Sequence, residues 1–163
     1  MKFELKSLRI HKEMSEETTC YSAELWIDGK PAFACSNRGV GGCDDIHPKG
    51  THTIGEVETY LRNHTPKGVH LFEFSSPIES LIIRLMEVAD AEKLLKARLG
   101  KSFVFIENGT VQAVSPARGR KFDEAWATAV AERHPERQRV TPTQNWEEAV
   151  NILAAPQTEG AAS

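Results

Sequence analysis

The sequence predicts an α+β fold: a three-stranded antiparallel meander at the N-terminus, a long central helix, a second β-hairpin and C-terminal helices. Three observations predict this class. Residues 21–27 alternate apolar and polar side chains and run into Asp28-Gly29, a pair typical of type I′ hairpin turns. Residues 76–79 combine an N-cap serine with a proline at the first helical position, which opens a long helix. A second turn pair, Asn108-Gly109, lies between two apolar runs.

The N-terminal meander is predicted from alternation and turn residues. A first strand covers residues 3–11, where the phase shift between Leu5 and Leu8 indicates a bulge or a twist. The third strand returns from the Asp28-Gly29 turn over residues 31–35, and because Pro31 has no N–H to donate, we expect it to start at a sheet edge. Residues 37–50 contain four glycines and little hydrophobic pattern, so they are predicted to form a long loop.

Two helices and an ambiguous segment follow. Thr53-Ile54-Gly55-Glu56 matches a capping box and predicts a short helix that ends before Pro66. Residues 69–74 fit either a strand or an extended connector, and we favour a strand. The long helix has a wide apolar face from Ile78 to Leu99, with a possible break at Asp90 and a stop at Gly100.

The C-terminal part is predicted as a hairpin followed by two helices. Residues 103–106 and 111–114 form the arms around Asn108-Gly109. One amphipathic helix contains Trp126 and stops by His134-Pro135, and Asn145 is expected to cap a last short helix. Residues 1–155 are therefore predicted to be one domain, and residues 156–163 a disordered tail.

Composition excludes several function classes. The chain has 163 residues, of which 40% are hydrophobic and 26% charged, with a net charge of -3, so neither a DNA-wrapping protein nor a DNA mimic is favoured. The N-terminus has no signal-peptide pattern, and the longest apolar segment, residues 78–89, is interrupted by Arg84 and Glu87. Three cysteines leave at least one unpaired, which favours a reducing compartment. The sequence predicts a cytoplasmic protein without membrane association.

The most distinctive motif is the glycine loop, Asn37-Arg38-Gly39-Val40-Gly41-Gly42, which continues into Asp44 and Asp45. Clustered glycines let backbone N–H groups turn toward an anion, so a ligand site built from Asn37, Arg38, Gly39, Gly41, Gly42, Asp44 and Asp45 is one interpretation. The loop lacks the lysine of a P-loop and the spacing of a dinucleotide fingerprint. The alternative is that the glycines only shape a tight exit from the third strand.

The same segment also carries residue types that serve in metal binding and nucleophilic catalysis. Cys35, Cys43, His47 and His52 offer zinc-ligand atoms, but no paired Cys-x-x-Cys or His-Glu-x-x-His spacing is present. Cys43 as a nucleophile needs a histidine base, and the candidates for it are His47, His52, His64 and His70. We therefore predict no metal, no cofactor and no catalytic residue.

Two further features are candidates for binding. Arg118, Arg120 and Lys121 precede a predicted helix and suit a phosphate or an acidic protein surface, or else form a solvated loop. Trp26 shares a strand face with Ser22 and Glu24, so it offers an aromatic anchor for a protein partner if no helix covers that face.

Residues 15–30, the glycine loop and residues 103–109 together resemble a family of small uncharacterised phage and mobile-element proteins. The resemblance implies a phage-borne accessory protein that binds and modulates or inhibits a host protein complex, including defence complexes in the manner of anti-CRISPR proteins, and acts in the host cytoplasm. The alternative is a small nucleotide- or anion-binding protein or enzyme that uses residues 39–42. Nucleic-acid binding is less favoured, and a homodimer stays open.

Overall fold

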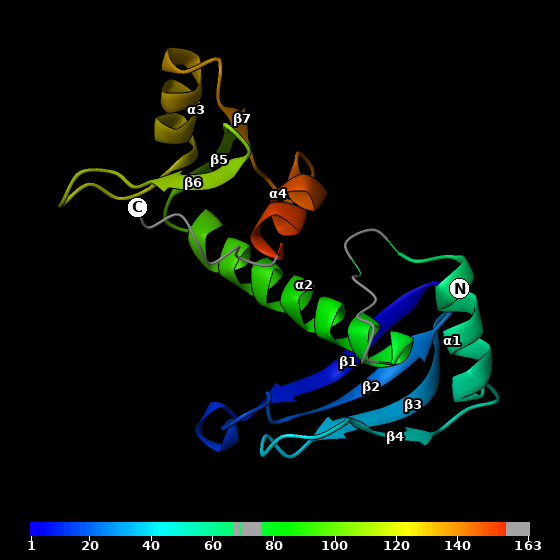
Figure 1. Cartoon of the computed structure of the whole chain (residues 1–163). Coiled ribbons are helices and arrows are strands. Elements are labelled where there is room, and N and C mark those ends of the chain that lie inside the picture. The colour runs from blue at the N-terminus through cyan, green and yellow to red at the C-terminus, as the bar shows by residue number, and fades with distance from the viewer. Residues whose placement is uncertain (67–68, 70–75, 156–163) are drawn as a thin grey trace, which may run out of the picture. The chain divides into compact units, whose positions relative to one another are not determined.

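The computed structural model describes residues 1–66, 69 and 76–155 (Figure 1). The chain divides into two compact units, Met1–Met86 and Glu87–Ser163, with the boundary inside one long helix. The α+β class is confirmed, with a sheet in each unit. Each unit is described below by itself, and a single domain over residues 1–155 stays a prediction.

The first unit is built on a four-stranded antiparallel sheet in which the strands follow chain order. The strands are β1 (Phe3–Ile10), β2 (Tyr21–Ile27), β3 (Lys30–Asn37) and β4 (Asp45–Pro48), and a short 3-10 helix, η1 (Lys12–Met14), follows β1. The predicted type I′ turn is confirmed, because Asp28 and Gly29 have φ of 49° and 78°. The predicted bulge is also confirmed by a register shift between Lys6 and Arg9, where Ser7 has φ of 54°.

The prediction of three strands was wrong in one respect: the segment predicted as a long loop contains β4. This strand pairs with β3 from Ser36 opposite Asp45 to Phe33 opposite Pro48. Strand β3 is therefore interior to the sheet. Pro31 is tolerated there because it lies at a register shift next to the turn and beyond the last residue of β4.

The core of the first unit lies between one face of this sheet and two helices, α1 (Ile54–Asn63) and the first part of α2 (Pro77–Leu99). Leu25 and Phe33 are completely buried and pack with Val57, Leu61 and Ile82. Both predicted capping boxes are present, one formed by Thr53 and Glu56 and one by Ser76 and Glu79. Val69 is buried, and the rest of the segment predicted as a strand over residues 70–74 lies outside the described residues.

The second unit begins within α2, which runs to Leu99 without the break considered at Asp90. The predicted hairpin is confirmed as β5 (Phe103–Glu107) and β6 (Thr110–Val114), joined by Asn108-Gly109 with φ of 51° and 71°. A third strand that the sequence did not predict, β7 (Gln138–Arg139), pairs with the other edge of β5.

Strand β5 is buried on both faces. Val104 and Ile106 pack in one cluster with Ala91 and Leu95 of α2 and with Val150 of α4 (Trp146–Leu153). The opposite face carries two aromatic rings that pack on α3 (Glu124–Arg133), namely Phe103 and Phe105 against Ala127.

Asn145 precedes α4 as predicted, but its side chain does not cap the helix. It adopts a left-handed conformation with φ of 53°, and its Nδ2 donates to the Arg139 carbonyl at 2.9 Å. Within the described parts of the chain, no helix combines the length and the apolar character needed to cross a membrane. The predicted tail, residues 156–163, lies outside the described residues.

Candidate functional site

The glycine loop joins β3 to β4 and reverses the chain within a few residues. Gly39, Gly41 and Gly42 have φ of 85°, 87° and 98°, values that side-chain-bearing residues rarely adopt. The glycines at these positions are therefore explained by backbone conformation alone. Whether the loop also binds a ligand depends on where its polar groups point.

The side chain of Asn37 is the centre of the loop. Its Oδ1 accepts hydrogen bonds from Thr18 Oγ1 at 2.7 Å and from the Gly39 N–H at 2.9 Å. Its Nδ2 donates to Asp44 Oδ1 at 2.9 Å and to the Gly42 carbonyl at 3.3 Å. Asn37 is buried, its contact with the Gly39 N–H is buried as well, and the other three contacts are partly buried. The predicted binding residue is thus an internal hub that fixes the loop.

A second loop, after η1, is locked onto the first. The Gly39 carbonyl accepts backbone hydrogen bonds from Glu16, Glu17 and Thr18 at 2.8, 3.0 and 3.3 Å. A Cβ at Gly39 would lie 2.2 Å from the Met14 carbonyl oxygen, so the two backbones are in direct contact. The two loops therefore form one rigid pair.

Asp44 closes the loop from the other end. Its Oδ2 accepts from the Tyr21 hydroxyl at 2.5 Å, and its backbone N–H donates to Glu79 Oε1 at 2.9 Å. Burial raises the pKa of the Asp44 carboxyl, although the hydrogen bonds from Tyr21 and Asn37 act in the opposite direction. Burial, followed by the neighbouring Asp44 carboxylate, raises the pKa of the Tyr21 hydroxyl.

These contacts bear directly on the anion-site interpretation. The Gly39 and Gly41 N–H groups donate to Asn37 Oδ1 and Thr18 Oγ1, the latter at 3.3 Å, so they point into the protein. The Asp44 carboxylate adds negative charge beside the same loop. The arrangement favours a rigid support over a cradle for phosphate.

The outer surface of the loop pair carries exposed apolar side chains. Val40 is 59% exposed and Met14 is 58% exposed, which makes them the two most exposed large hydrophobic residues of the described chain. Arg38 is exposed between Asn37 and Gly39, and Cys43 is exposed near the start of β4. We call Met14, Arg38 and Val40 the glycine-loop rim.

Comparisons of the chain with protein-family models, with curated proteins and with solved structures found no match. The site is therefore interpreted from its own geometry.

Trp26 lies on the sheet face opposite the core, and its ring is part of a polar network. Its Nε1 donates to Glu24 Oε2 at 3.1 Å, and Lys6 Nζ lies 5.2 Å from the ring centroid. Glu24 also forms an ion pair with Lys49. The half-buried indole is thus already held by charged neighbours, so it is less available as an anchor than the rim.

The remaining predicted site residues are Asp45 in the first unit and three basic residues in the second unit. Asp45 is exposed at the first position of β4. Arg118, Arg120 and Lys121 are exposed and belong to the second unit. The three basic residues form the basic loop before α3, but the N-terminus of this helix is capped by Asp123, whose carboxylate accepts from the Trp126 N–H at 2.7 Å. The Trp126 N–H is therefore already bonded to a carboxylate and is not free to bind a phosphate at this helix terminus.

Burial and the grouping of possible ligands bear on the alternatives based on metal or thiol chemistry. In the parts of the chain that the structure describes, no group of three or more His, Cys, Asp or Glu residues is placed to hold a metal ion. Cys20 and Cys35 are buried, and burial raises the pKa of the Cys35 thiol to about 11. Cys43 is exposed.

Sequence reasoning missed several residues that build the loop pair. Thr18, Tyr21 and Glu79 supply hydrogen bonds to it from distant parts of the chain, and no local pattern marks them. Met14 was also missed, although a large apolar residue in a polar turn is a signal that could have been used.

Proposed function

We propose that the chain is a non-enzymatic binding protein that docks on a protein partner through the glycine-loop rim. One observation carries the proposal: the two most exposed large apolar side chains of the described chain belong to Met14, at the end of η1, and Val40, in the glycine loop, and hydrogen bonds to the Gly39 carbonyl hold these two segments together. Side chains presented on a rigid support lose less conformational entropy when they bind. The rim is therefore organised before it meets a partner.

The surroundings of the rim fit a protein surface as partner. Glu13, Glu16 and Arg38, which are close in sequence to Met14 and Val40, are exposed. A small apolar centre with a charged border is the usual organisation of protein interfaces. The resemblance to phage and mobile-element proteins supports a host protein or complex, including a defence complex, as the partner.

The alternative, a nucleotide or anion site at residues 39–42, has less support. Two of the loop N–H groups donate to Asn37 and Thr18, and the Asp44 carboxylate lies beside them. We therefore treat nucleotide binding as an outcome to be measured beside protein binding.

The experiment is affinity capture from host lysate with three matched baits. The first is the wild-type protein, the second is Met14→Ser with Val40→Ser, and the third is Ile83→Ser with Leu94→Ser. Ile83 and Leu94 are each 41% exposed on α2, so the third bait controls for the general loss of exposed apolar surface. Captured proteins are identified and quantified by mass spectrometry.

The proposal expects a stoichiometric protein that the wild-type and α2 baits retain and the rim bait loses by about tenfold or more. Equal capture by all three baits, or no captured protein, would contradict it. A thermal-shift screen with nucleotides and inorganic phosphate runs in parallel. A large shift with one nucleotide that Asn37→Ala abolishes would instead support the alternative.

A further inference from the structure

Among the four edge strands of the two described sheets, β6 is the one whose own sequence carries no protective feature, although α4 contacts this strand. Strand β1 carries lysines and a bulge, β4 is four residues long and ends in proline, and β7 has two residues. Strand β6 reads Thr-Val-Gln-Ala-Val, with no charge, no proline and no bulge. Four of its five residues are exposed. Such an edge is available to pair with another strand.

The hairpin geometry decides which backbone groups of β6 are free. In a two-residue hairpin the residues that flank the turn, here Glu107 and Thr110, form a hydrogen-bonded pair, and the pattern alternates from there. Val111 and Ala113 therefore direct their N–H and C=O groups away from β5. An independent contact agrees: the Val104 carbonyl, opposite Ala113, accepts from the Val140 N–H at 2.9 Å on the β7 side.

We infer that β6 pairs antiparallel with β6 of a second copy of this chain, and that Gln112 meets its own counterpart on the two-fold axis. In this register Val111 of one copy lies opposite Ala113 of the other, and their outward N–H and C=O groups satisfy one another in both directions. Thr110 lies opposite Val114, which is 38% exposed in the single chain. The pairing joins two three-stranded sheets into one continuous sheet.

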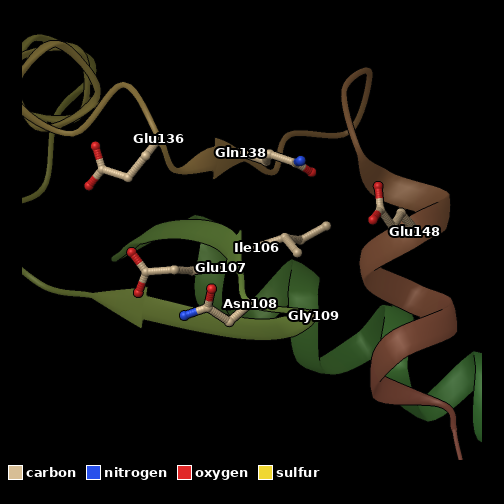
Figure 2. Close-up of a pocket in the computed structure, with 7 residues that line it drawn as sticks. All are labelled: Ile106, Glu107, Asn108, Gly109, Glu136, Gln138 and Glu148. Atoms are coloured by element: carbon tan, nitrogen blue, oxygen red, sulfur yellow. The ribbon is translucent and has the colours of Figure 1, made fainter.

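Charge complementarity at both ends of the paired strands favours a second copy as the occupant. A hollow of about 370 Å³ lies at the hairpin turn, and its walls include three carboxylates, Glu107, Glu136 and Glu148 (Figure 2). These come from β5, from the segment before β7 and from α4. Arg137, which does not itself line the hollow, forms ion pairs with Glu107 at 3.2 Å and with Glu136 at 4.0 Å, and His134 Nδ1 lies 3.2 Å from the same Glu136 carboxylate.

The other end of β6 continues into the basic loop with Arg118, Arg120 and Lys121. In the antiparallel pair, the chain that leaves Val114 passes the partner copy's hairpin turn. The basic loop of each copy therefore leaves the pair at the end of the sheet where the other copy's acidic hollow lies, although no residue of β6 itself lines that hollow, and the two-fold axis makes the arrangement reciprocal. One self-complementary surface accounts for the uncharged edge, the acidic hollow and the basic loop.

The test uses a charge swap at the two-fold axis. Gln112 is exposed, so Gln112→Lys and Gln112→Glu are expected to fold normally, but each places like charges opposite each other in the dimer. Masses are measured by sedimentation for the wild type, for each variant alone and for an equimolar mixture. The wild type is expected at twice the 18.1 kDa of one chain, each variant alone as a monomer, and the mixture as a heterodimer.

Two further results decide the proposal. Replacing Arg118, Arg120 and Lys121 with alanine is expected to weaken the dimer by about tenfold at low salt and to reduce its dependence on salt. A wild-type chain that stays monomeric up to about 100 µM would overturn the inference. A dimer that both Gln112 variants leave intact would also overturn it, because that dimer would use another surface. A mixture of the two variants that stays monomeric would overturn it as well.

Discussion

Asn37 Nδ2 donates to Asp44 Oδ1 at 2.9 Å, and this contact joins the two ends of the glycine loop beside the pairing of β3 with β4. The other three hydrogen bonds of Asn37 reach Thr18, Gly39 and Gly42. The loop is thus organised around one buried amide, and its glycines adopt the positive φ values with which the backbone turns around that amide.

Asn37→Ala is expected to destabilise the first unit by about 2 to 4 kcal/mol, because it removes one buried and three partly buried hydrogen bonds at once. Hydrogen exchange of the amides in β2 and β3, with urea unfolding followed in parallel, measures the change. The neighbouring Arg38→Ala is the control, since Arg38 is exposed and its loss should change stability by less than about 0.5 kcal/mol. Equal effects of the two variants would contradict the hub role.

Gly39 and Gly42 share positive φ but differ in their surroundings. A Cβ at Gly39 meets the Met14 carbonyl oxygen at 2.2 Å, whereas a Cβ at Gly42 meets nothing within 4 Å. Gly42→Ala is therefore expected to cost about 1 kcal/mol of backbone strain, and Gly39→Ala about 3 kcal/mol or more because the two loops must separate. Thermal unfolding of both variants compares them, and a milder effect at Gly39 would exclude the tight loop contact.

The fold was predictable where local chemistry decides it. Asp28-Gly29, Asn108-Gly109 and the two capping boxes each determine a turn or a helix start through their own residues. Strand β4 was missed because Asp45-Ile46-His47-Pro48 has almost no apolar alternation, so its pairing depends on the glycine loop that brings it back to β3.

The candidate site was only partly predictable for a related reason. Clustered glycines at residues 39–42 correctly indicated an unusual backbone, but free N–H groups and internally bonded ones give the same sequence pattern. The partners that decide the matter, Thr18 and Glu79, come from other elements. Long-range hydrogen bonds of this kind leave no periodic signal.

Asp44 should make the stability of the first unit depend on pH. Burial raises its folded-state pKa above the unfolded value, so the folded state holds its proton more tightly. The stabilising contribution of the protonated form is fully present below about pH 4 and is lost as pH rises through the folded pKa. The carboxyl resonance of Asp44 should titrate with a midpoint above the ordinary aspartate value. In urea unfolding across this pH range, Asp44→Asn should lack the corresponding change in stability.

The exposed Cys43 should react with a thiol reagent before the two buried cysteines do. Cys43 is exposed, whereas Cys20 and Cys35 are buried and burial raises the pKa of Cys35 to about 11. Iodoacetamide at pH 8 should therefore add one label to the native protein, at Cys43, and three labels after denaturation. Peptide mapping by mass spectrometry locates the adducts, and early labelling of Cys35 would contradict its burial.

Glu79 links two structures through its two carboxylate oxygens. Oε2 accepts from the Ser76 N–H at 3.1 Å and completes the cap of α2, while Oε1 accepts from the Asp44 N–H at 2.9 Å. Ser76→Ala removes only the hydroxyl that caps Glu79 N–H and should cost about 1 kcal/mol. Glu79→Ala removes both contacts and should cost about 2 kcal/mol or more. Hydrogen exchange should separate the two variants, because the Asp44 amide becomes less protected in Glu79→Ala alone.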